Sequence, residues 1–212
     1  MRTGARVELT GVCCTHSRRP VVRRADLVVE PGERVALTGT NGSGKTTLVR
    51  TILGLHPLTS GAITVDGQQA RGQRDWDQRR KDTAWIPQRQ AAGHFPLLAH
   101  ELLSSSGDLD AAMSAAGRLG VAQFADRPLD TLSGGQLQRM YLARALGCVA
   151  AGARLLLADE PTAALDFTGQ AEAAELLVDQ PVTVLVVTHD RALAARCDRV
   201  LEMADGHLRE VA

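Results

Sequence analysis

The chain has 212 residues, and its 24 Lys and Arg residues balance 24 Asp and Glu residues. A net charge of zero argues against a large nucleic-acid-binding surface, so we expect no nucleic-acid partner. No apolar run approaches the roughly 20 residues of a membrane-spanning helix, and the N-terminus lacks the apolar stretch of a secretory signal. We therefore expect a single globular domain over residues 1–212.

In the first half of the chain, strand-like segments surround one glycine-rich loop. Residues 5–12 alternate polar and apolar side chains, which is typical of a half-buried strand. Residues 20–33 favour two strand segments that end at a Pro-Gly turn. Also expected are strands at 34–39, 61–68 and 83–87, a helix at 45–55, and a solvated loop or exposed helix at 71–82.

The second half of the chain alternates helices with short apolar strands. Residues 97–130 favour short helices, and a longer amphipathic helix is expected from residue 133. Apolar strands that alternate with helices indicate a parallel sheet covered on both faces, and the strand pairs near the two chain ends suggest an added antiparallel layer. The expected elements are strands at 154–159 and 182–189, a helix near 168–178, a short helix after 189, and a hairpin at 199–211.

The stretch GTNGSGKTT, residues 39–47, joins a predicted strand to a predicted helix. It fits G-x-x-x-x-G-K-[ST], in which glycines let successive backbone N–H groups converge on an anion. Lys45, one of only two lysines in this arginine-rich chain, can reach the outer phosphates of a nucleotide. The alternative is a glycine-rich turn before a helix. The predicted nucleotide-binding residues are Gly39, Asn41, Gly42, Ser43, Gly44, Lys45, Thr46 and Thr47, and the Thr46 hydroxyl is also a predicted Mg²⁺ ligand.

Two adjacent carboxylates follow the predicted strand at 154–159. The sequence LLLADEP places Asp159 and Glu160 at the carboxyl end of that strand, where parallel sheets bind their ligands. Asp159 can orient Mg²⁺, while Glu160 can polarise a water for attack on a γ-phosphate. An acidic turn after a core strand is the structural alternative, and the glycine loop weighs against it.

Four further motifs stand in a recognisable order. They are PQ at 87–88, LSGGQ at 132–136, ALD at 164–166 and VTHD at 187–190. Together with the glycine loop and LLLADEP, they resemble the ABC-type ATPases over nearly the whole chain. The resemblance implies an α/β fold: a P-loop NTPase core with a parallel sheet, an antiparallel β layer, and a short helical subdomain at about 89–150 that carries the signature motif. It also implies ATP and Mg²⁺ as cofactors.

The resemblance carries residue roles as well. Ser133, Gly134 and Gly135, with Gln136, would grip the γ-phosphate that the partner subunit binds, since a helix N-terminus suits an anion. Gln88 would link Mg²⁺ and the attacking water to a membrane subunit. His189 would contact the γ-phosphate and help to position Glu160, although a histidine that closes a strand is more often structural when judged alone.

Some positions depart from the family pattern. His16 stands where the family usually stacks the adenine on a larger aromatic residue, so we expect weaker stacking there. Cys13, Cys14 and His16 could instead suggest a metal site, but no fourth ligand is in view. Ala163 supplies no hydroxyl where the family often has serine. The segments 88–133 and 166–189 are short for the family.

These features predict the ATP-hydrolysing subunit of an ABC transporter, active as a homodimer, or with a paired ATPase subunit, that ATP closes. Its membrane permease would be another polypeptide, which would hold it at the inner, cytoplasmic face of the membrane. An importer would add a solute-binding protein. Three rivals stay open: a soluble ABC-type ATPase that acts as a regulator or assembly factor, a P-loop kinase, and a nucleic-acid-processing ABC ATPase, which normally carries a long coiled-coil insertion.

The cargo is weakly specified by the sequence. PQRQAAGHFPLLAHELL, residues 87–103, resembles the matching stretch of the zinc/manganese importer branch. The alternative is another small-cargo system, such as a haem or multidrug exporter.

Overall fold

The computed structural model describes residues 4–88 and 97–211, and its main element is a mixed sheet of six strands in the order β5-β6-β7-β3-β8-β9. Neighbouring strands from β5 to β8 run parallel, and only β9 pairs antiparallel, with β8. The strands are β3 (Arg34–Thr38), β5 (Thr83–Ile86), β6 (Leu155–Asp159), β7 (Thr183–Val187), β8 (Arg199–Ala204) and β9 (His207–Glu210).

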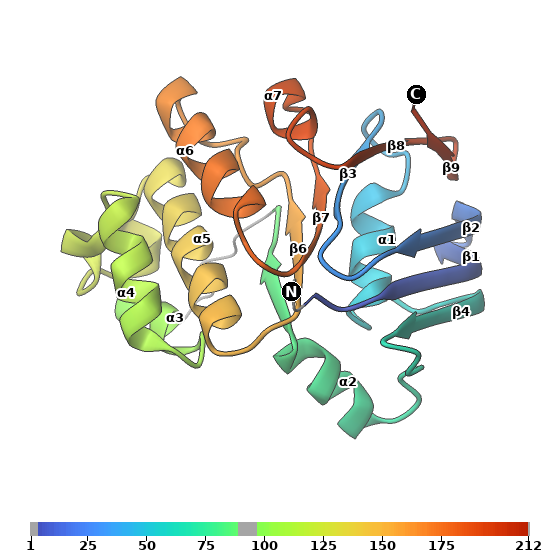
Figure 1. The fold of residues 1–212 in the computed structure, drawn as a ribbon, viewed down its shortest axis with the longest axis horizontal. Coiled ribbons are helices and arrows are strands. Elements are labelled where there is room, and N and C mark those ends of the chain that lie inside the picture. The colour runs from blue at the N-terminus through green and yellow to red at the C-terminus, as the bar shows by residue number, and fades with distance from the viewer. Residues whose placement is uncertain (1–3, 89–96, 212) are drawn as a thin grey trace.

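A second, antiparallel sheet lies beside the first on the side of α1 (Figure 1). Its strand order is β2-β1-β4, with β1 (Val7–His16), β2 (Arg19–Val29) and β4 (Ser60–Val65). The long strands β1 and β2 are irregular, because their register shifts at three points along the pair. Register shifts of this kind increase the local twist of a strand pair.

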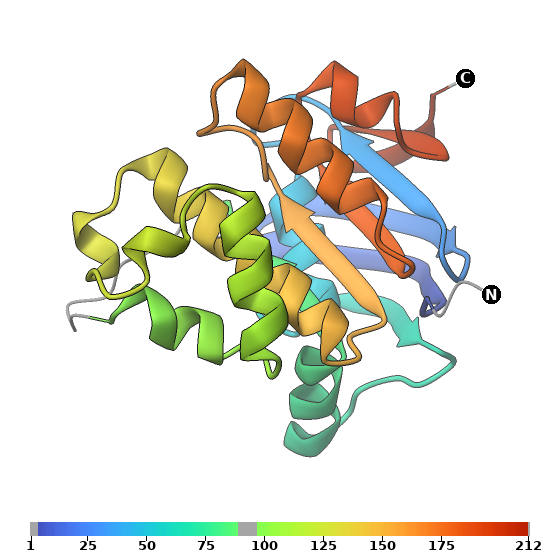
Figure 2. The same cartoon turned by 60° about the vertical axis from the view of Figure 1, so that its left-hand side comes forward.

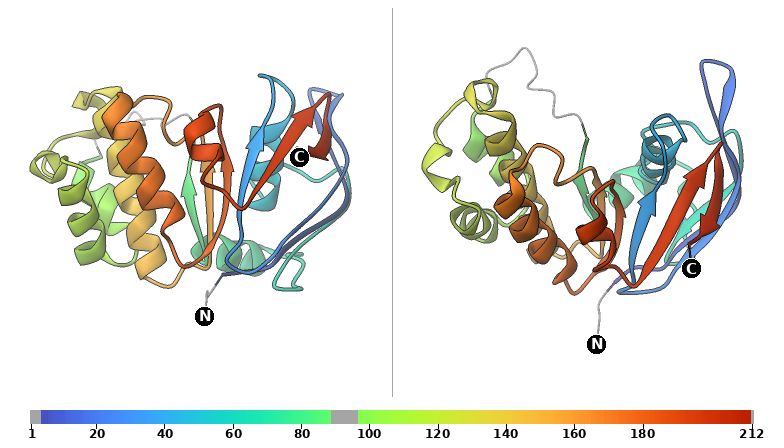
Figure 3. Two further views of the ribbon diagram at one scale, coloured as in Figure 1. Left: turned by 45° about the horizontal axis from the view of Figure 1, so that its top comes forward. Right: turned by 90° about the horizontal axis from the view of Figure 1, so that it is seen from above.

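Helices cover both faces of the mixed sheet (Figures 2 and 3). On one face, α3, α4 and α5 form a helical layer that continues into α6, and on the other face α1 separates the two sheets. The helices are α1 (Lys45–Ile52), α2 (Gln73–Lys81), α3 (Ala99–Ser104), α4 (Leu109–Arg118), α5 (Gly134–Ala150), α6 (Phe167–Val178) and α7 (Arg191–Ala194), with short 3₁₀ turns at Ala122–Phe124 and Leu129–Thr131.

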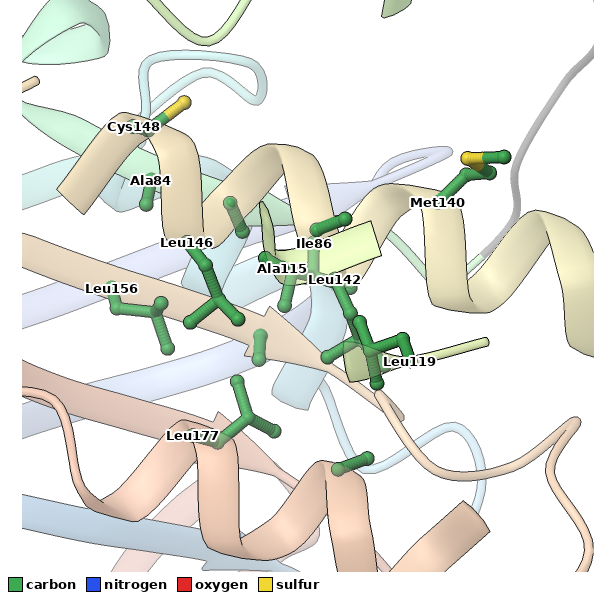
Figure 4. Packing of buried hydrophobic residues seen from close by; sticks show 14 of the residues in the cluster. Ala84, Ile86, Ala115, Leu119, Met140, Leu142, Leu146, Cys148, Leu156 and Leu177 are labelled. Carbon is green, nitrogen blue, oxygen red and sulfur yellow. The ribbon is translucent and has the colours of Figure 1, made fainter. Parts of the chain in front are cut away.

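The alternation of side chains along the buried strands builds two hydrophobic cores. In β6, Leu155 and Leu157 pack with the antiparallel sheet and α1, whereas Leu156 and Ala158 pack with the helical layer. Figure 4 shows the second core, where Leu156 lies between side chains of α5 and α6. Because successive residues of a strand point to opposite faces, the four consecutive apolar positions of β6 can serve both cores at once.

The parallel strands bring four connections to one edge of the mixed sheet. β5, β6, β7 and β3 are neighbours in that order, and each ends at the same edge because they all run in one direction. The segments that follow them hold Gln88, Glu160, His189 and the 39–44 loop, respectively. Residues from distant parts of the chain therefore meet at this edge.

The predicted α/β architecture is confirmed, and of the two alternatives for the polar segment 71–82 the structure has the mostly exposed helix α2. Two details differ. The two strand segments predicted within residues 20–33 form one continuous strand, β2, which ends at Val29 before the Pro-Gly turn. The C-terminal hairpin does not join the antiparallel layer, because β8 pairs with β3 and extends the mixed sheet. Part of the predicted helical subdomain, residues 89–96, lies outside the described residues. None of the helices in the described segments has the length and apolar character to cross a membrane.

Candidate functional site

An open cavity of about 530 Å³ lies where the parallel strands end. Most of the predicted site residues line it: His16, Asn41, Gly42, Gly44, Lys45, Thr46, Thr47, Gln88, Asp159, Glu160 and His189. Gly39 and Ser43 belong to the same loop but do not line the cavity. Sequence reasoning missed Val21, Arg50, His56 and Val187, which also line it. They come from β2, the far part of α1, the connection after α1 and the end of β7. Val187 opens the VTHD motif, but no local motif marks the other three.

The loop before α1 needs glycine at two of its positions. Gly39 has φ 131°, and a side chain there would run into the backbone carbonyl of Met203. Gly44 has φ 108° and faces the carbonyl of Val21 in the same way. Because glycine alone tolerates both the dihedrals and the close approach, the loop can wrap tightly in front of α1. Gly44 gives α1 no side-chain cap, so no side-chain cap covers the first N–H groups of this helix.

Lys45 is enclosed by the loop that precedes it. Its side chain is only 6% exposed, and its Nζ donates to the carbonyl oxygens of Gly39, at 2.7 Å, and Thr40, at 2.9 Å. Burial lowers the pKa of Lys45, and the carboxylates of Glu160 and Asp159 oppose that shift. The ammonium group therefore lies at the wall of the cavity on two carbonyl acceptors, which phosphate oxygens could replace.

Asp159 ends β6 as a buried carboxyl group. Its side chain is 1% exposed, and within the described part of the chain neither carboxylate oxygen has a hydrogen-bond partner of good geometry. Burial raises its pKa, while the neighbouring Thr46 hydroxyl and Lys45 oppose the rise. Unsatisfied carboxylate oxygens beside a hydroxyl are the hard ligands that Mg²⁺ prefers. This arrangement fits a magnesium ion held by Asp159 and Thr46, with Gln88 on the same cavity wall.

Glu160 adopts a backbone conformation that few residues other than glycine accept. Its φ is 53°, and its N–H donates to the carbonyl of Val187 at 2.9 Å, which ties it to the end of β7. Burial raises the pKa of Glu160, with His189 as the leading opposing group. A strained residue at the cavity, held by a neighbouring strand, has its carboxylate placed by the fold rather than by its own preference.

His189 joins the Glu160 carboxylate to the glycine loop. Its Nε2 lies 3.3 Å from Glu160 Oε1 and 3.2 Å from Asn41 Oδ1, and its backbone N–H donates to Glu160 Oε2 at 3.4 Å. Because both Nε2 neighbours are acceptors, this geometry favours the tautomer with the proton on Nε2. The three side chains form a polar cluster that could orient a water beside a bound phosphate.

The signature residues are not at this cavity. Ser133, Gly135 and Gln136 line a separate cavity of about 490 Å³, and Gly134 is the first residue of α5 beside it. Ser133 Oγ accepts from the Gln136 N–H at 3.3 Å, and Gln136 Oε1 accepts from the Ser133 N–H at 3.0 Å. Among the described residues, none lines both cavities. The fold therefore does not bring the two predicted anion sites of one chain together.

The predicted adenine contact, His16, lines the cavity of about 530 Å³, which we call the nucleotide-type cavity. Its ring lies near a second histidine ring, a contact that the sequence did not suggest. Its ring is 6.2 Å from the ring of His56, at an angle of 31°. Cys14, considered above as a metal ligand, instead points into the core beside Thr51, with 3.3 Å between Sγ and Oγ1. Within residues 4–88 and 97–211, no group of three or more His, Cys, Asp and Glu side chains is placed to hold a metal ion.

A larger cavity of about 930 Å³ lies between β4 and α2, among Arg71, Arg79 and Arg154. It contains none of the motif residues and lies away from the ends of β3, β6 and β7. Size alone is therefore a poor guide here, and the smaller cavity is the candidate site because the strand ends deliver opposed charges to it.

The family model of the ABC transporters matches residues 22–163 of this chain. The chain belongs to the ABC transporter family. The match begins in β2 and extends past the Glu160 position, so it includes the glycine loop, the signature motif and both carboxylates.

Relatives with different cargoes are similarly close to this ABC protein. The macrolide export protein MacB of Hahella chejuensis is 38% identical over 202 residues, covering 89% of this chain but only 30% of that protein. The hemin import protein HmuV of Rhodopseudomonas palustris is 36% identical, covering 89% of this chain and 75% of its own length. The manganese transport protein MntB of Bacillus subtilis is 33% identical, and the match covers 97% of this chain and 85% of that protein. These relatives identify an ABC-type ATPase and leave the branch unresolved.

Solved structures of ABC cassettes share this fold. The dimeric structure of the cassette MJ0796 matches with a TM-score of 0.86 and 28% identity, covering 97% of both chains. A further structure of that cassette is a dimer bound to ADP and phosphate. A bacterial Atm1-family exporter with ATP bound matches with a TM-score of 0.85 at 23% identity, which shows the fold alone. The ABC cassette is thus an ATP-binding fold that forms dimers in its relatives.

Proposed function

We propose that this chain is the ATP-hydrolysing subunit of an ABC transporter, and that it works as a homodimer on a separate membrane permease. The observation that carries the homodimer is the separation of the two anion sites. Lys45 and Ser133 lie in different cavities of one chain, so a single ATP can contact both only if the second comes from another copy. One glycine loop and one signature motif per chain then give two composite sites per dimer.

At each composite site, the glycine loop binds the phosphates. Its N–H groups and the uncapped start of α1 surround the anion, and Lys45 exchanges its two carbonyl acceptors for phosphate oxygens. Asp159, Thr46 and Gln88 would hold Mg²⁺, which supplies charge neutralisation to the phosphates when bound. His16 faces the adenine, and Ser133, Gly134, Gly135 and Gln136 of the second copy close over the γ-phosphate.

Hydrolysis in this proposal uses Glu160 as the general base. A carboxylate with a raised pKa is a better proton acceptor than an ordinary one, and burial supplies that shift. Glu160 takes a proton from the attacking water, whose oxygen bonds to the γ-phosphorus while the bond to the ADP oxygen breaks. The Nε2 atom of His189 lies 3.3 Å from Glu160 Oε1, so His189 helps to position that carboxylate, and we expect the same side chain to contact the γ-phosphate once ATP is bound.

The decisive experiment uses Glu160→Gln, which keeps size and hydrogen-bonding reach but removes the base. With Mg-ATP, we expect slow hydrolysis and an accumulated homodimer, because each bound ATP links dimerisation to nucleotide binding. Adding Ser133→Arg should abolish the dimer and leave single-chain ATP binding intact, since the bulky cation would occupy the partner's phosphate site. Analytical sedimentation with and without Mg-ATP measures both. A Glu160→Gln chain that binds ATP and stays monomeric would rule out the homodimer, and normal hydrolysis would remove Glu160 as the base.

The same proposal places the protein at the inner face of the cell membrane, held there by its permease. Co-purification with a membrane protein would support this placement. If no membrane protein accompanies the chain when it is purified from either the membrane or the soluble fraction, the soluble regulator or assembly factor would be favoured instead.

For the cargo, we propose zinc or manganese import through a solute-binding protein. The support is the HFPLLAHELL resemblance at residues 94–103, of which residues 94–96 lie outside the described structure, together with the match to MntB over 85% of that relative. Loss of the gene should lower cellular zinc or manganese and slow growth under chelation. Normal metal content with defective handling of hemin or a macrolide would favour the exporter or haem alternatives.

A further inference from the structure

Phe167 is an aromatic side chain that the fold leaves in water. It is the first residue of α6, and it is 87% exposed, whereas the next most exposed large apolar side chain of the described residues, Leu55, is 53% exposed. The buried face of α6 is made by other residues, among them Ala173, Ala174 and Leu177. The core of one chain therefore gives no reason for a phenylalanine at this position.

Polar contacts hold the backbone of Phe167 in place. Its neighbour Asp166 caps α6, because Asp166 Oδ1 accepts from the Gly169 N–H at 3.0 Å. The same oxygen accepts from Arg139 Nη2 of α5 at 3.2 Å, and Arg139 Nη1 donates to the Leu119 carbonyl at 3.0 Å. Arg139 thus links the starts of α5 and α6, so Phe167 is presented at a fixed place beside the signature motif.

The segment just before Phe167 runs from a hollow beside Glu160 to the Ser133 cavity. Ala163 lies in a hollow of about 450 Å³ that contains Glu160 and His189, and Ala164 begins the part of the segment that lines the Ser133 cavity. Packing here is close, since a side chain on Gly135 would approach the Ala164 carbonyl at 3.1 Å. Figure 2 shows the N-terminal ends of α5 and α6 on the same side of the molecule. Phe167 directly follows Asp166, the last residue of this segment that lines the Ser133 cavity.

We infer that Phe167 is an apolar contact of the ATP-closed dimer, where it packs against a second copy of this chain. This inference rests on the proposed homodimer and adds a residue outside its phosphate contacts. In the proposed homodimer, the surface from Glu160 through residues 163–166 to Ser133 closes over ATP, and Phe167 directly follows Asp166, the last residue of this segment. Two-fold symmetry buries the residue twice in each dimer. The closed dimer thereby gains an apolar contact that needs no nucleotide phosphate.

The test measures the dimer dissociation constant of Glu160→Gln with Mg-ATP, alone and combined with Phe167→Ala. We expect Phe167→Ala to weaken dimerisation by about 100-fold, roughly tenfold for each of its two copies. Binding of a fluorescent ATP analogue to the single chain should not change, because Phe167 does not line the nucleotide-type cavity. Phe167→Leu should recover part of the affinity, which a role in folding alone would not require.

Leu109 offers a matched control. It is also the first residue of a helix, α4, follows an aspartate cap, Asp108, and is 43% exposed. Leu109→Ala should leave the dimer dissociation constant within about twofold, as expected for a side chain outside the interface. If Phe167→Ala dimerises as tightly as its Glu160→Gln parent, the inference is overturned and the exposed ring serves another partner, such as the permease. If the parent binds ATP but stays monomeric, the proposed homodimer fails first and this contact fails with it.

Discussion

The two helix starts that carry the predicted anion sites are built in opposite ways. α1 begins at Gly44 without a side-chain cap, inside a cavity with buried Lys45 and Asp159. α5 begins at exposed Ser133, and its reciprocal bonds with Gln136 already satisfy two backbone N–H groups. A helix start without a cap leaves its first N–H groups to a ligand or to water, whereas a capping box satisfies part of a helix start without any ligand.

This difference separates two tasks that one ATP site must combine. The α1 site can bind a nucleotide within a single chain, because it gathers cation, carboxylates and free N–H groups. The α5 site keeps its shape without ligand and still has the Ser133 hydroxyl proton to donate, so it can add to a phosphate that another chain has bound. Changes at α1 should therefore affect binding and chemistry together, and changes at α5 should affect association.

The largest expected effect comes from Lys45→Ala. It removes a charge-assisted phosphate contact inside a preorganised loop, so we expect most ATP binding and all hydrolysis to be lost. The control is Lys81→Ala, which changes the only other lysine, an exposed residue at the end of α2. Nucleotide binding and phosphate release measure the effect. Near-normal hydrolysis by Lys45→Ala would show that the glycine loop is not the phosphate site.

Asp159→Asn should change the stability of the chain and its ATP hydrolysis in opposite directions. Burial raises the folded-state pKa of Asp159, so the unfolded chain loses this proton first as the pH rises. The free energy of unfolding then falls between the ordinary aspartate pKa and the raised one, and stays level above it. We expect Asp159→Asn to remove that fall, to be more stable than the native chain at neutral pH, and to lose Mg-ATP hydrolysis.

Denaturant unfolding at a series of pH values measures the Asp159 effect, with Asp110→Asn, an exposed carboxylate in α4, as control. An Asp159→Asn chain that is less stable than the native chain at neutral pH would mean that the carboxylate is satisfied in the folded state, contrary to its two unpartnered oxygens.

His16→Tyr probes the mouth of the α1 site. The exposed imidazole of His16 lies 6.2 Å from that of His56 at the cavity edge, and tyrosine offers a larger ring for a base. We expect adenine-nucleotide binding to tighten by roughly 0.5–1.5 kcal/mol. Tripolyphosphate, which has no base, serves as the control ligand and should bind equally to both chains. Calorimetric titration compares the two, and unchanged or weaker ATP binding would place His16 away from the base.

Short motifs predicted the α1 site because its key residues lie at the ends of strands of one parallel sheet or in the connections that follow those strands. Lys45, Asp159, Glu160 and His189 could be placed together once those strands were recognised. The strand order could not be predicted in this way, since β7 lies between β6 and β3 through pairings that no local pattern encodes. For the same reason the C-terminal hairpin was assigned to the wrong sheet, and His56 and Arg50 were missed because their placement depends on how whole elements pack.

The motif at the α5 site could be predicted, but the exposure of the residues around it could not. LSGGQ predicted a capped helix start, whereas the exposure of these residues depends on how α5 packs against its neighbours. The Arg139–Asp166 contact joins residues 27 positions apart, and neither sequence pattern nor helix periodicity indicates it. Phe167 lies one residue before the helix predicted near 168–178, and only the arrangement of α6 shows that its side chain faces solvent.

The smallest expected effect is that of Gln136→Ala, and it tests the α5 half of the comparison directly. The substitution removes the amide oxygen that accepts from the Ser133 N–H at 3.0 Å, while Ser133 Oγ can still accept from the N–H of residue 136. One exposed side-chain hydrogen bond at a helix start contributes about 0.5–1 kcal/mol, so the free energy of unfolding should fall by that amount. Gln73→Ala, which removes a comparable exposed amide bond to the Asp77 carboxylate in α2, is the control for the loss of one exposed side-chain hydrogen bond.

ATP binding by the single chain should be unchanged, because the affected N–H groups lie in the second cavity, while the Glu160→Gln dimer should weaken by a few-fold as the signature end frays. If Gln136→Ala instead reduced single-chain ATP affinity, the two helix starts would be coupled within one chain, and the division of tasks between α1 and α5 would be wrong.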